Sequence, residues 1–148
     1  MLKVIIKTFE ELTTQELYSI LRLRSEIFVV EQNCVYQDMD NKDQKALHVL
    51  GFKNGEIVAY TRVFKPGDYF KYASIGRVIV LQKERKHKYG NDIMNASIKG
   101  VKDHFNETNI MIGAQCYLKK FYNNLGFNEI GEEYLEDGIP HIHMVRSN

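Results

Sequence analysis

The sequence lacks tryptophan and has few cysteines or prolines. Its 148 residues include two cysteines and two prolines. Cys34 and Cys116 lie far apart and form no CxxC pair, which excludes a disulfide framework and a zinc knuckle. The apolar run Val4–Ile6 is too short for a signal peptide, and no stretch approaches the roughly 20 apolar residues that span a bilayer. We therefore expect a cytoplasmic protein with reduced thiols and no membrane partner.

An excess of one charge is also lacking. The chain has 20 basic and 19 acidic residues, for a net charge of +1. General nucleic-acid-binding proteins usually carry a marked basic excess, so we expect no nucleic-acid partner and only a local anion site. The length and the 44% hydrophobic residues suit one globular domain with one core. No linker, repeat or low-complexity segment divides the chain, and residues 1–148 are predicted to form a single domain.

Hydrophobic periodicity predicts alternating strands and helices. Thr13 and Glu16 form a capping-box pattern that begins the first helix, and Asn54-Gly55 favours the tight turn of a hairpin. Strands are expected at 3–8, 46–53, 56–65, 74–80, 109–114, 127–134 and 141–146. Helices are expected at 13–28, 90–105 and 118–124, with a loop or broken helix at 32–45. This order predicts an α/β fold with a mixed sheet and helices on both faces.

The segment after the 74–80 strand is strongly basic. It comprises Lys83, Arg85, Lys86, His87 and Lys88, and it leads into the helix that Gly90 opens. A helix N-terminus presents unpaired N–H groups and the positive end of its dipole, which together favour a phosphate or pyrophosphate. Taken alone, however, this segment would fit a solvated basic loop more readily than a phosphate site.

A second segment runs from Gln115 to Tyr122 and on to Gly126-Phe127. A polar residue leaves the end of a strand there, and a tyrosine follows two helical turns later. A tyrosine hydroxyl, of pKa about 10, is a suitable acid for a departing thiolate whose own pKa is about 8.5. Taken alone, Phe121-Tyr122 would fit core packing more readily than catalysis.

Together these segments resemble a known family. Val78–Val80, Arg85–Gly90 and the run Gln115–Phe127 resemble the cofactor-binding motifs of the GNAT superfamily of N-acetyltransferases. Arg22–Gln32 and the tail Tyr134–His141 are similar to the ElaA-like branch of that family. Four further residues fit that branch: Asp40, Asp43, Ala46 and His48.

The resemblance implies a mixed, mostly antiparallel central sheet that splays at the cofactor site. It also implies an acyl-CoA-dependent N-acetyltransferase, in which an amine directly attacks acetyl-CoA (coenzyme A). The backbone of Val78–Val80 would hold the pantetheine arm and polarise the acyl carbonyl, and Tyr122 would be the general acid. The residues implied to hold the cofactor are Val78, Ile79, Val80, Arg85, Lys86, His87, Lys88, Tyr89, Gly90, Asn91 and Gln115.

Lys88 departs from the family pattern. The loop pattern Gln/Arg-x-x-Gly-x-Gly/Ala has its first glycine at this position. If the position needs a positive φ, a side chain there costs about 1–2 kcal/mol. Lys88 could instead supply a cation to the same phosphates. Two outcomes stay open: a reshaped loop that still binds CoA, or weak CoA binding.

The acceptor is expected to be a small-molecule or peptide amine. Carboxylates of the branch-specific segments are predicted to form a rim that attracts a cationic amine: Glu31, Asp40, Asp43, Glu133, Glu136 and Asp137. The substrate-binding candidates are Glu31, His48, Tyr134 and His141. Glu31, His48 and His141 are also candidate bases, although each, taken alone, fits a structural or surface role more readily. His141 and His143 share a strand face without a nearby third ligand in the sequence, so no metal is expected.

Other functions stay open at this point. Lys88 is compatible with a catalytically weak or inactive acyl-CoA-binding module. Nucleic-acid binding through Lys83–Lys88 is disfavoured by the nearly neutral net charge. Arg22–Glu31 also resembles the GNAT-like acyl-homoserine-lactone synthases, although this chain is short for that group. Many relatives pair, so a homodimer is compatible with the resemblance, but no apolar stripe marks an interface.

Overall fold

The computed structural model describes residues 2–147, and these form one mixed sheet between helices. The strands are β1 (Lys3–Thr8), β2 (Leu47–Lys53), β3 (Glu56–Phe64), β4 (Ala73–Val80), β5 (Ile110–Gln115), β6 (Asn128–Glu136) and β7 (Ile139–Arg146). The helices are α1 (Thr14–Arg24), α2 (Tyr89–Phe105) and α3 (Lys119–Asn123). The seven strands lie in the order β1-β2-β3-β4-β5-β7-β6. Among the described residues, no helix is long and apolar enough to cross a membrane.

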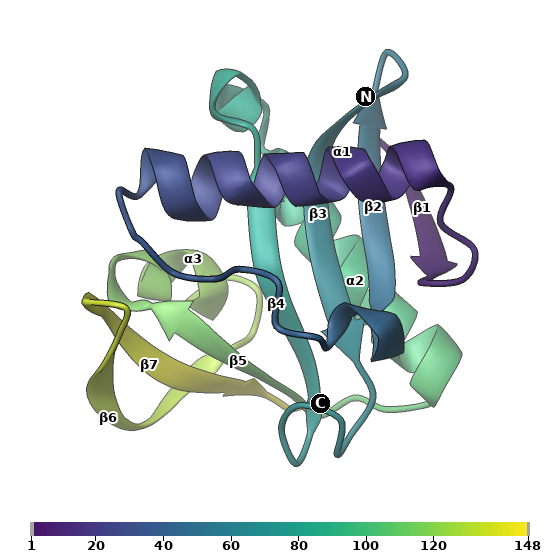
Figure 1. Ribbon diagram of the computed structural model, residues 1–148. Coiled ribbons are helices and arrows are strands. Elements are labelled where there is room, and N and C mark those ends of the chain that lie inside the picture. Colours follow the sequence, from purple (N-terminus) through teal and green to yellow (C-terminus); the bar gives the residue numbers. More distant parts are fainter. Residues whose placement is uncertain (1, 148) are drawn as a thin grey trace.

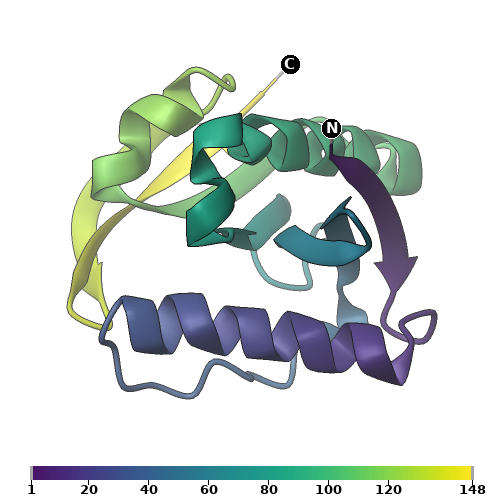
Figure 2. The same cartoon turned by 90° about the horizontal axis from the view of Figure 1, so that it is seen from above.

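The helices cover both faces of the sheet. Figure 1 shows α1 crossing one face of β1–β4, and Figure 2 shows α1 and α2 on opposite sides of the strands. Ile20, Leu23 and Ile79 are buried between α1 and the sheet, whereas Ile93 and Met94 anchor α2 in the larger core on the other face. The expected α/β class, with helices on both faces of a mostly antiparallel sheet, is confirmed.

The local signals at the start of α1 and in the first hairpin are also confirmed. The Glu16 N–H donates to the Thr13 hydroxyl at 3.0 Å, and the Thr13 N–H donates to the Glu16 carboxylate at 2.9 Å. Asn54 and Gly55 have φ values of 53° and 79°, as the tight turn between β2 and β3 requires.

The end of the first helix differs from the prediction. Past Arg24 the chain continues as a π-helix over Ser25–Glu31, in which N–H groups donate to carbonyls five residues earlier. The Gln32 N–H, for example, donates to the Ile27 carbonyl at 3.3 Å. This wider winding buries Ile27 in the core and turns Phe28 toward the Arg77 guanidinium, 5.9 Å from the ring centre. Such turns often occur at functional sites.

The sheet opens between β4 and β5, which confirms the splayed sheet that the family resemblance implied. These two strands run parallel and pair at only two positions, Ala73 with Ile110 and Ser74 with Met111. β4 nevertheless continues along β3 as far as Val80. From residue 75 onward, the edge of β4 that faces β5 therefore has no strand partner, and Figure 1 shows β5 and β7 diverging from β4.

A β-bulge interrupts β4 within this open stretch. Tyr60 pairs with Ile79 and Arg62 with Gly76, so β4 has one more residue than β3 over the same length. Arg77 in the bulge has φ 48°, a left-handed conformation that is uncommon for residues other than glycine. The bulge reorients the backbone of β4 where it borders the opening.

Candidate active site

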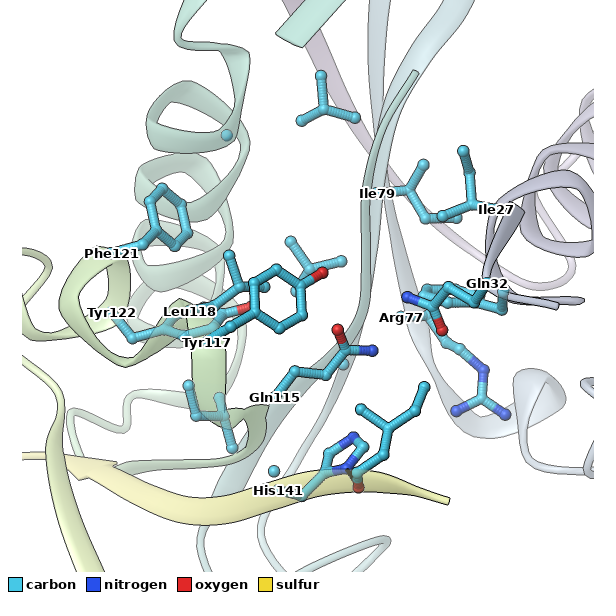
Figure 3. Close-up of a pocket in the computed structure, with 18 of the residues that line it drawn as sticks. Ile27, Gln32, Arg77, Ile79, Gln115, Tyr117, Leu118, Phe121, Tyr122 and His141 are labelled. Carbon is cyan, nitrogen blue, oxygen red and sulfur yellow. Dashed lines mark hydrogen bonds between the residues drawn. The ribbon is translucent and has the colours of Figure 1, made fainter. Parts of the chain in front are cut away.

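A cavity of about 560 Å³ lies at the opening between β4 and β5. This volume falls in the range typical of small-molecule sites. Five of the predicted site residues line it from β4 and the basic segment: Val78, Ile79, Val80, Arg85 and Lys88. Six more line it from other elements: Glu31, Gly90, Asn91, Gln115, Tyr122 and His141. Figure 3 shows Tyr122 on one side of this cavity, Ile79 on the opposite side, and Gln115 and His141 near one another.

Five other predicted site residues do not line the cavity: Lys86, His87, Tyr89, His48 and Tyr134. Lys86 is exposed, and His87 lies 3.5 Å from the Glu84 carboxylate. Tyr89, the first residue of α2, is buried, with the Lys53 ammonium 6.0 Å from its ring centre. The rings of Tyr134 and His141 stack at 5.8 Å between centres.

His48 is fully buried in the core. Its Nε2 lies 2.9 Å from the Asp43 carbonyl oxygen and its Nδ1 lies 2.6 Å from the Tyr60 hydroxyl. Because a carbonyl only accepts, Nε2 carries the proton, and the Tyr60 hydroxyl donates to Nδ1. Burial lowers the pKa of His48, so the ring stays neutral. Both ring nitrogens form hydrogen bonds within the core. His48 therefore has a structural role and does not line the cavity.

The basic segment forms a short 3-10 helix, Gln82–His87, that ends immediately before α2. Lys88, between the two helices, has φ 61° and ψ 27°, the left-handed conformation that the family's loop glycine would adopt without strain. No side chain caps α2 at this end. The Asn91 and Asp92 N–H groups donate to the Lys88 carbonyl, whereas those of Tyr89 and Gly90 have no hydrogen-bond partner within residues 2–147. These two N–H groups can receive an anion beside the cavity.

Arg85 is already paired in this structure. Its Nε donates to the Val80 carbonyl at 2.9 Å, and its Nη2 lies 2.8 Å from the Glu31 carboxylate. The pair connects the end of the π-helix with the basic segment. It is partly exposed, so its contribution to stability is small and a competing anion can replace Glu31 at low cost.

Tyr122 reaches the cavity from α3. The residue is only 6% exposed, and burial, followed by the nearby Tyr117, raises the pKa of its hydroxyl. Within the described residues this hydroxyl has no hydrogen-bond partner and is not among the fully buried unsatisfied polar atoms, so it is open to the cavity. Tyr122 therefore stays protonated at neutral pH and can act as a proton donor.

A network of three arginines and three aspartates supports the bulge from behind. Arg24 is completely buried and pairs with Asp38 at 2.8 Å and with Asp43 at 2.7 Å. Arg77 holds the other Asp38 oxygen at 2.8 Å. Arg62 completes the network by pairing with Asp40 and Asp43. The network connects α1 and the 33–45 loop with β3 and the bulge of β4.

This network corrects one expectation. Asp40 and Asp43 were predicted to belong to an acidic rim that attracts the acceptor. That expectation is wrong for these two residues, because arginines neutralise both. Burial alone would raise the pKa of Asp40, but the hydrogen bonds and charge of Arg62 outweigh it and hold this pKa well below its usual range.

Comparisons with known proteins agree with this geometry. A family model described as an acetyltransferase (GNAT) domain matches residues 10–147. The chain belongs to the GNAT acetyltransferase family. Escherichia coli K12 protein ElaA is 44% identical over 138 residues, which cover 92% of this chain and 90% of that protein. The predicted similarity to the ElaA-like branch of the GNAT family is confirmed.

Solved structures of this GNAT protein's relatives share its fold. The crystal structure of E. coli ElaA matches with a TM-score of 0.92 at 41% identity, over 99% of this chain and 100% of that chain. An acyl-CoA N-acyltransferase from Pseudomonas aeruginosa matches with a TM-score of 0.94 at 35% identity, with the same coverage. The acyl-homoserine lactone synthase BjaI matches with a TM-score of 0.80, over 98% of this chain and 82% of that chain, but its 15% identity shows the fold alone.

Several cavity residues were missed by sequence reasoning. Arg77 and Tyr117 are two polar examples. Glu136 and Asp137, two carboxylates of the predicted acidic rim, also line the cavity. Tyr117 is 75% exposed, and Figure 3 shows its ring reaching across the cavity from the α3 side toward β4. Its position between the motif residues Gln115 and Tyr122 was the available signal. The place of Arg77 in a bulge carries no comparable signal.

Proposed function

We propose that this protein transfers an acetyl group from acetyl-CoA to the amine of a small molecule or peptide. The observation that carries the proposal is the opening between β4 and β5, with the Tyr122 hydroxyl at its side. The relationship to an acyl-CoA N-acyltransferase supports acyl-CoA as the donor class. Cys34 and Cys116 are free thiols, which fits a reducing compartment, and we propose a cytoplasmic location.

The free edge of β4 supports binding of the pantetheine arm. The Leu81 N–H donates to the Val58 carbonyl of β3. Because successive residues of a strand direct their N–H and C=O groups to opposite edges, those of Val80 face the opening. Val78 lies two residues earlier in the strand, so its backbone N–H and C=O groups also face the opening. We therefore assign the amide donors for the pantetheine and the acyl oxygen to Val78 and Val80 rather than to Ile79.

The N-terminus of α2 supports binding of the pyrophosphate. Its free N–H groups lie beside the cavity, and the Lys88 side chain adds a positive charge there. Arg85 becomes a further phosphate ligand when an anion replaces Glu31. The description of the matching family model as an acetyltransferase domain supports acetyl as the transferred group.

The chemistry requires an acid for the leaving group. After the amine attacks the thioester carbonyl, the tetrahedral oxyanion receives hydrogen bonds from the β4 amides. Collapse expels the CoA thiolate, and Tyr122 donates its proton to that sulfur. Burial raises the pKa of Tyr122, but the same cavity would desolvate the thiolate and raise the pKa of its thiol as well. The pKa values of the two groups therefore stay close, and proton transfer from Tyr122 to the sulfur costs little free energy.

The test is titration calorimetry with acetyl-CoA, CoA and octanoyl-CoA, followed by a thiol-release assay over a panel of amines. We expect acetyl-CoA and CoA to bind, and acetyl-CoA to release thiol only when an acceptor amine is present. Absence of binding would refute the proposal. Binding with no thiol release for any amine would instead support an inactive acyl-CoA-binding module, and a preference for octanoyl-CoA would refute the acetyl assignment.

A further inference from the structure

The far end of the cavity, beyond Tyr122, is built by β5, β7 and the turn between β6 and β7. Gln115 of β5 pairs with His141 of β7, and both line the cavity. Asp137 and Gly138 have φ values of 51° and 79°, so the chain reverses in a tight turn. This turn places Glu136 and Asp137 on the cavity wall. Figure 3 shows the His141 ring below Gln115 at this end.

The hydrogen bond of His141 determines which ring nitrogen can accept a proton. Nδ1 lies 2.7 Å from the Ile139 carbonyl oxygen. Because a carbonyl only accepts, Nδ1 carries the hydrogen, and Nε2 of the neutral ring keeps its lone pair. His141 is only 6% exposed, and within residues 2–147 its Nε2 has no hydrogen-bond partner. Nε2 is not among the fully buried unsatisfied polar atoms, so it is open to the cavity as a nitrogen base without a hydrogen-bond partner.

The charges around His141 favour a cation. The Glu136 carboxylate lies 3.7 Å from Nε2, too far for a hydrogen bond, and places a negative charge beside the ring. Within the described residues, neither Glu136 nor Asp137 has a lysine or arginine within 4.0 Å. By contrast, the negative charges of Glu31 and Asp38 are matched by arginines. The far end of the cavity is therefore its negative end.

The other two candidate bases are less well placed. His48 is buried in the core with both ring nitrogens bonded. Glu31 lies 2.8 Å from Arg85 of the basic segment, at the proposed pyrophosphate end of the cavity rather than at its far end. We propose that the acceptor is an aliphatic primary amine, which is cationic in neutral solution, and that His141 Nε2 removes its proton before attack. This inference rests on the proposed acetyl transfer and names the acceptor class and the base for it.

The protons balance in this scheme. The ammonium gives one proton to Nε2, and the neutral amine forms a C–N bond to the thioester carbon. The C–S bond breaks, and the CoA sulfur takes the proton of Tyr122. The surplus proton on the new amide nitrogen returns to the Tyr122 phenolate, and the imidazolium releases its proton to water after the product leaves.

The test compares two acceptors of similar shape, benzylamine and aniline, in the thiol-release assay at neutral pH. Benzylamine is protonated under these conditions and aniline is not, so only benzylamine needs the base. The variant is His141→Asn, whose side-chain amide can still donate to the Ile139 carbonyl but cannot accept a proton. His143→Asn, two residues along the same strand face and outside the cavity, is the matched control.

We expect His141→Asn to lower kcat/KM for benzylamine by about 10²–10⁴-fold, the usual range for a general base, and to leave that for aniline within about tenfold of wild type. His143→Asn should change neither by more than about threefold. Equal losses with both acceptors would show that His141 is structural and overturn the inference. Glu136→Gln should raise KM for benzylamine by up to about fivefold and leave KM for aniline unchanged, and equal effects on the two would contradict the cationic assignment.

The wild-type protein separates this inference from the proposed function. Tyramine, spermidine and lysine extend the set of aliphatic amines. If acetyl-CoA binds and aniline is acetylated but none of the aliphatic amines is, the acceptor class is wrong and the acetyl transfer stands. If acetyl-CoA does not bind, the proposed function itself fails.

Discussion

At Lys88, the effect of backbone strain on stability can be separated from the effect of the side-chain charge on CoA binding. Its left-handed backbone, at φ 61° and ψ 27°, costs about 1–2 kcal/mol for a residue with a side chain. Glycine removes that cost but adds about 0.5–1 kcal/mol of backbone entropy loss on folding. We therefore expect Lys88→Gly to be more stable than wild type by about 0.5–1 kcal/mol, a rise in Tm of about 1–4 °C for a chain of this size. Lys88→Ala keeps the strain and should not be stabilised.

Binding then reports on the charge. Both variants lose the same cation at the cavity, so both should bind CoA up to about fivefold more weakly, with a shallower salt dependence. Lys86→Ala removes a charge from the same segment but outside the cavity, and it should bind CoA as wild type does. The measurements are thermal unfolding and calorimetry with CoA at two salt concentrations. Equal stabilities for the glycine and alanine variants, or much tighter CoA binding by Lys88→Gly, would refute this reasoning.

The Arg–Asp network behind the bulge gives two further predictions. Arg24→Ala should lower the free energy of unfolding by about 3–5 kcal/mol, because it leaves buried Asp38 and Asp43 short of a partner. Exposed Arg22→Ala, measured by the same urea unfolding, should stay within about 0.5 kcal/mol, and equal effects would contradict the network's role. In the folded protein, Arg62 holds the pKa of Asp40 below its value of about 3.9 in the unfolded chain. The Arg62–Asp40 pair therefore stabilises the fold above about pH 3.9, and this stabilisation is lost as the pH falls below that value. Asp40→Asn should therefore show a weaker loss of stability in acid than wild type, and identical pH curves would contradict the assignment.

Short-range signals account for the parts of the fold that sequence predicted well. The capping box of Thr13 and Glu16, and the Asn54-Gly55 turn, act between residues at most three apart, so the sequence contains them completely. The resemblance to the GNAT family supplied the splayed sheet, which no local pattern encodes. The π-helix over Ser25–Glu31 was not predicted, because its winding depends on how Ile27 and Phe28 pack against distant strands.

The site shows the same division. The spacing of the motifs correctly predicted that Gln115, Tyr122 and the start of α2 belong to the site. Gln115 and Tyr122 line the cavity, and so does Gly90 of α2. Sequence could not show which neighbours turn away from the cavity. His48 pairs with Tyr60 across β2 and β3, and Asp40 pairs with Arg62, 22 residues further along the chain. Such long-range pairs are determined by tertiary packing, which local sequence does not show. Because of these pairs, His48 and Asp40 stabilise the fold and do not line the cavity.

The most direct test of the central claim is the turnover of Tyr122→Phe with its CoA affinity measured on the same samples. The claim is that the β4–β5 opening holds acetyl-CoA and that the Tyr122 hydroxyl protonates the leaving sulfur without contributing to CoA binding. Loss of that hydroxyl should lower kcat by about 10²–10⁴-fold, while phenylalanine keeps the ring packing and changes Kd for CoA by less than about threefold. Unchanged kcat, or a loss of activity explained entirely by weaker CoA binding, would contradict the account.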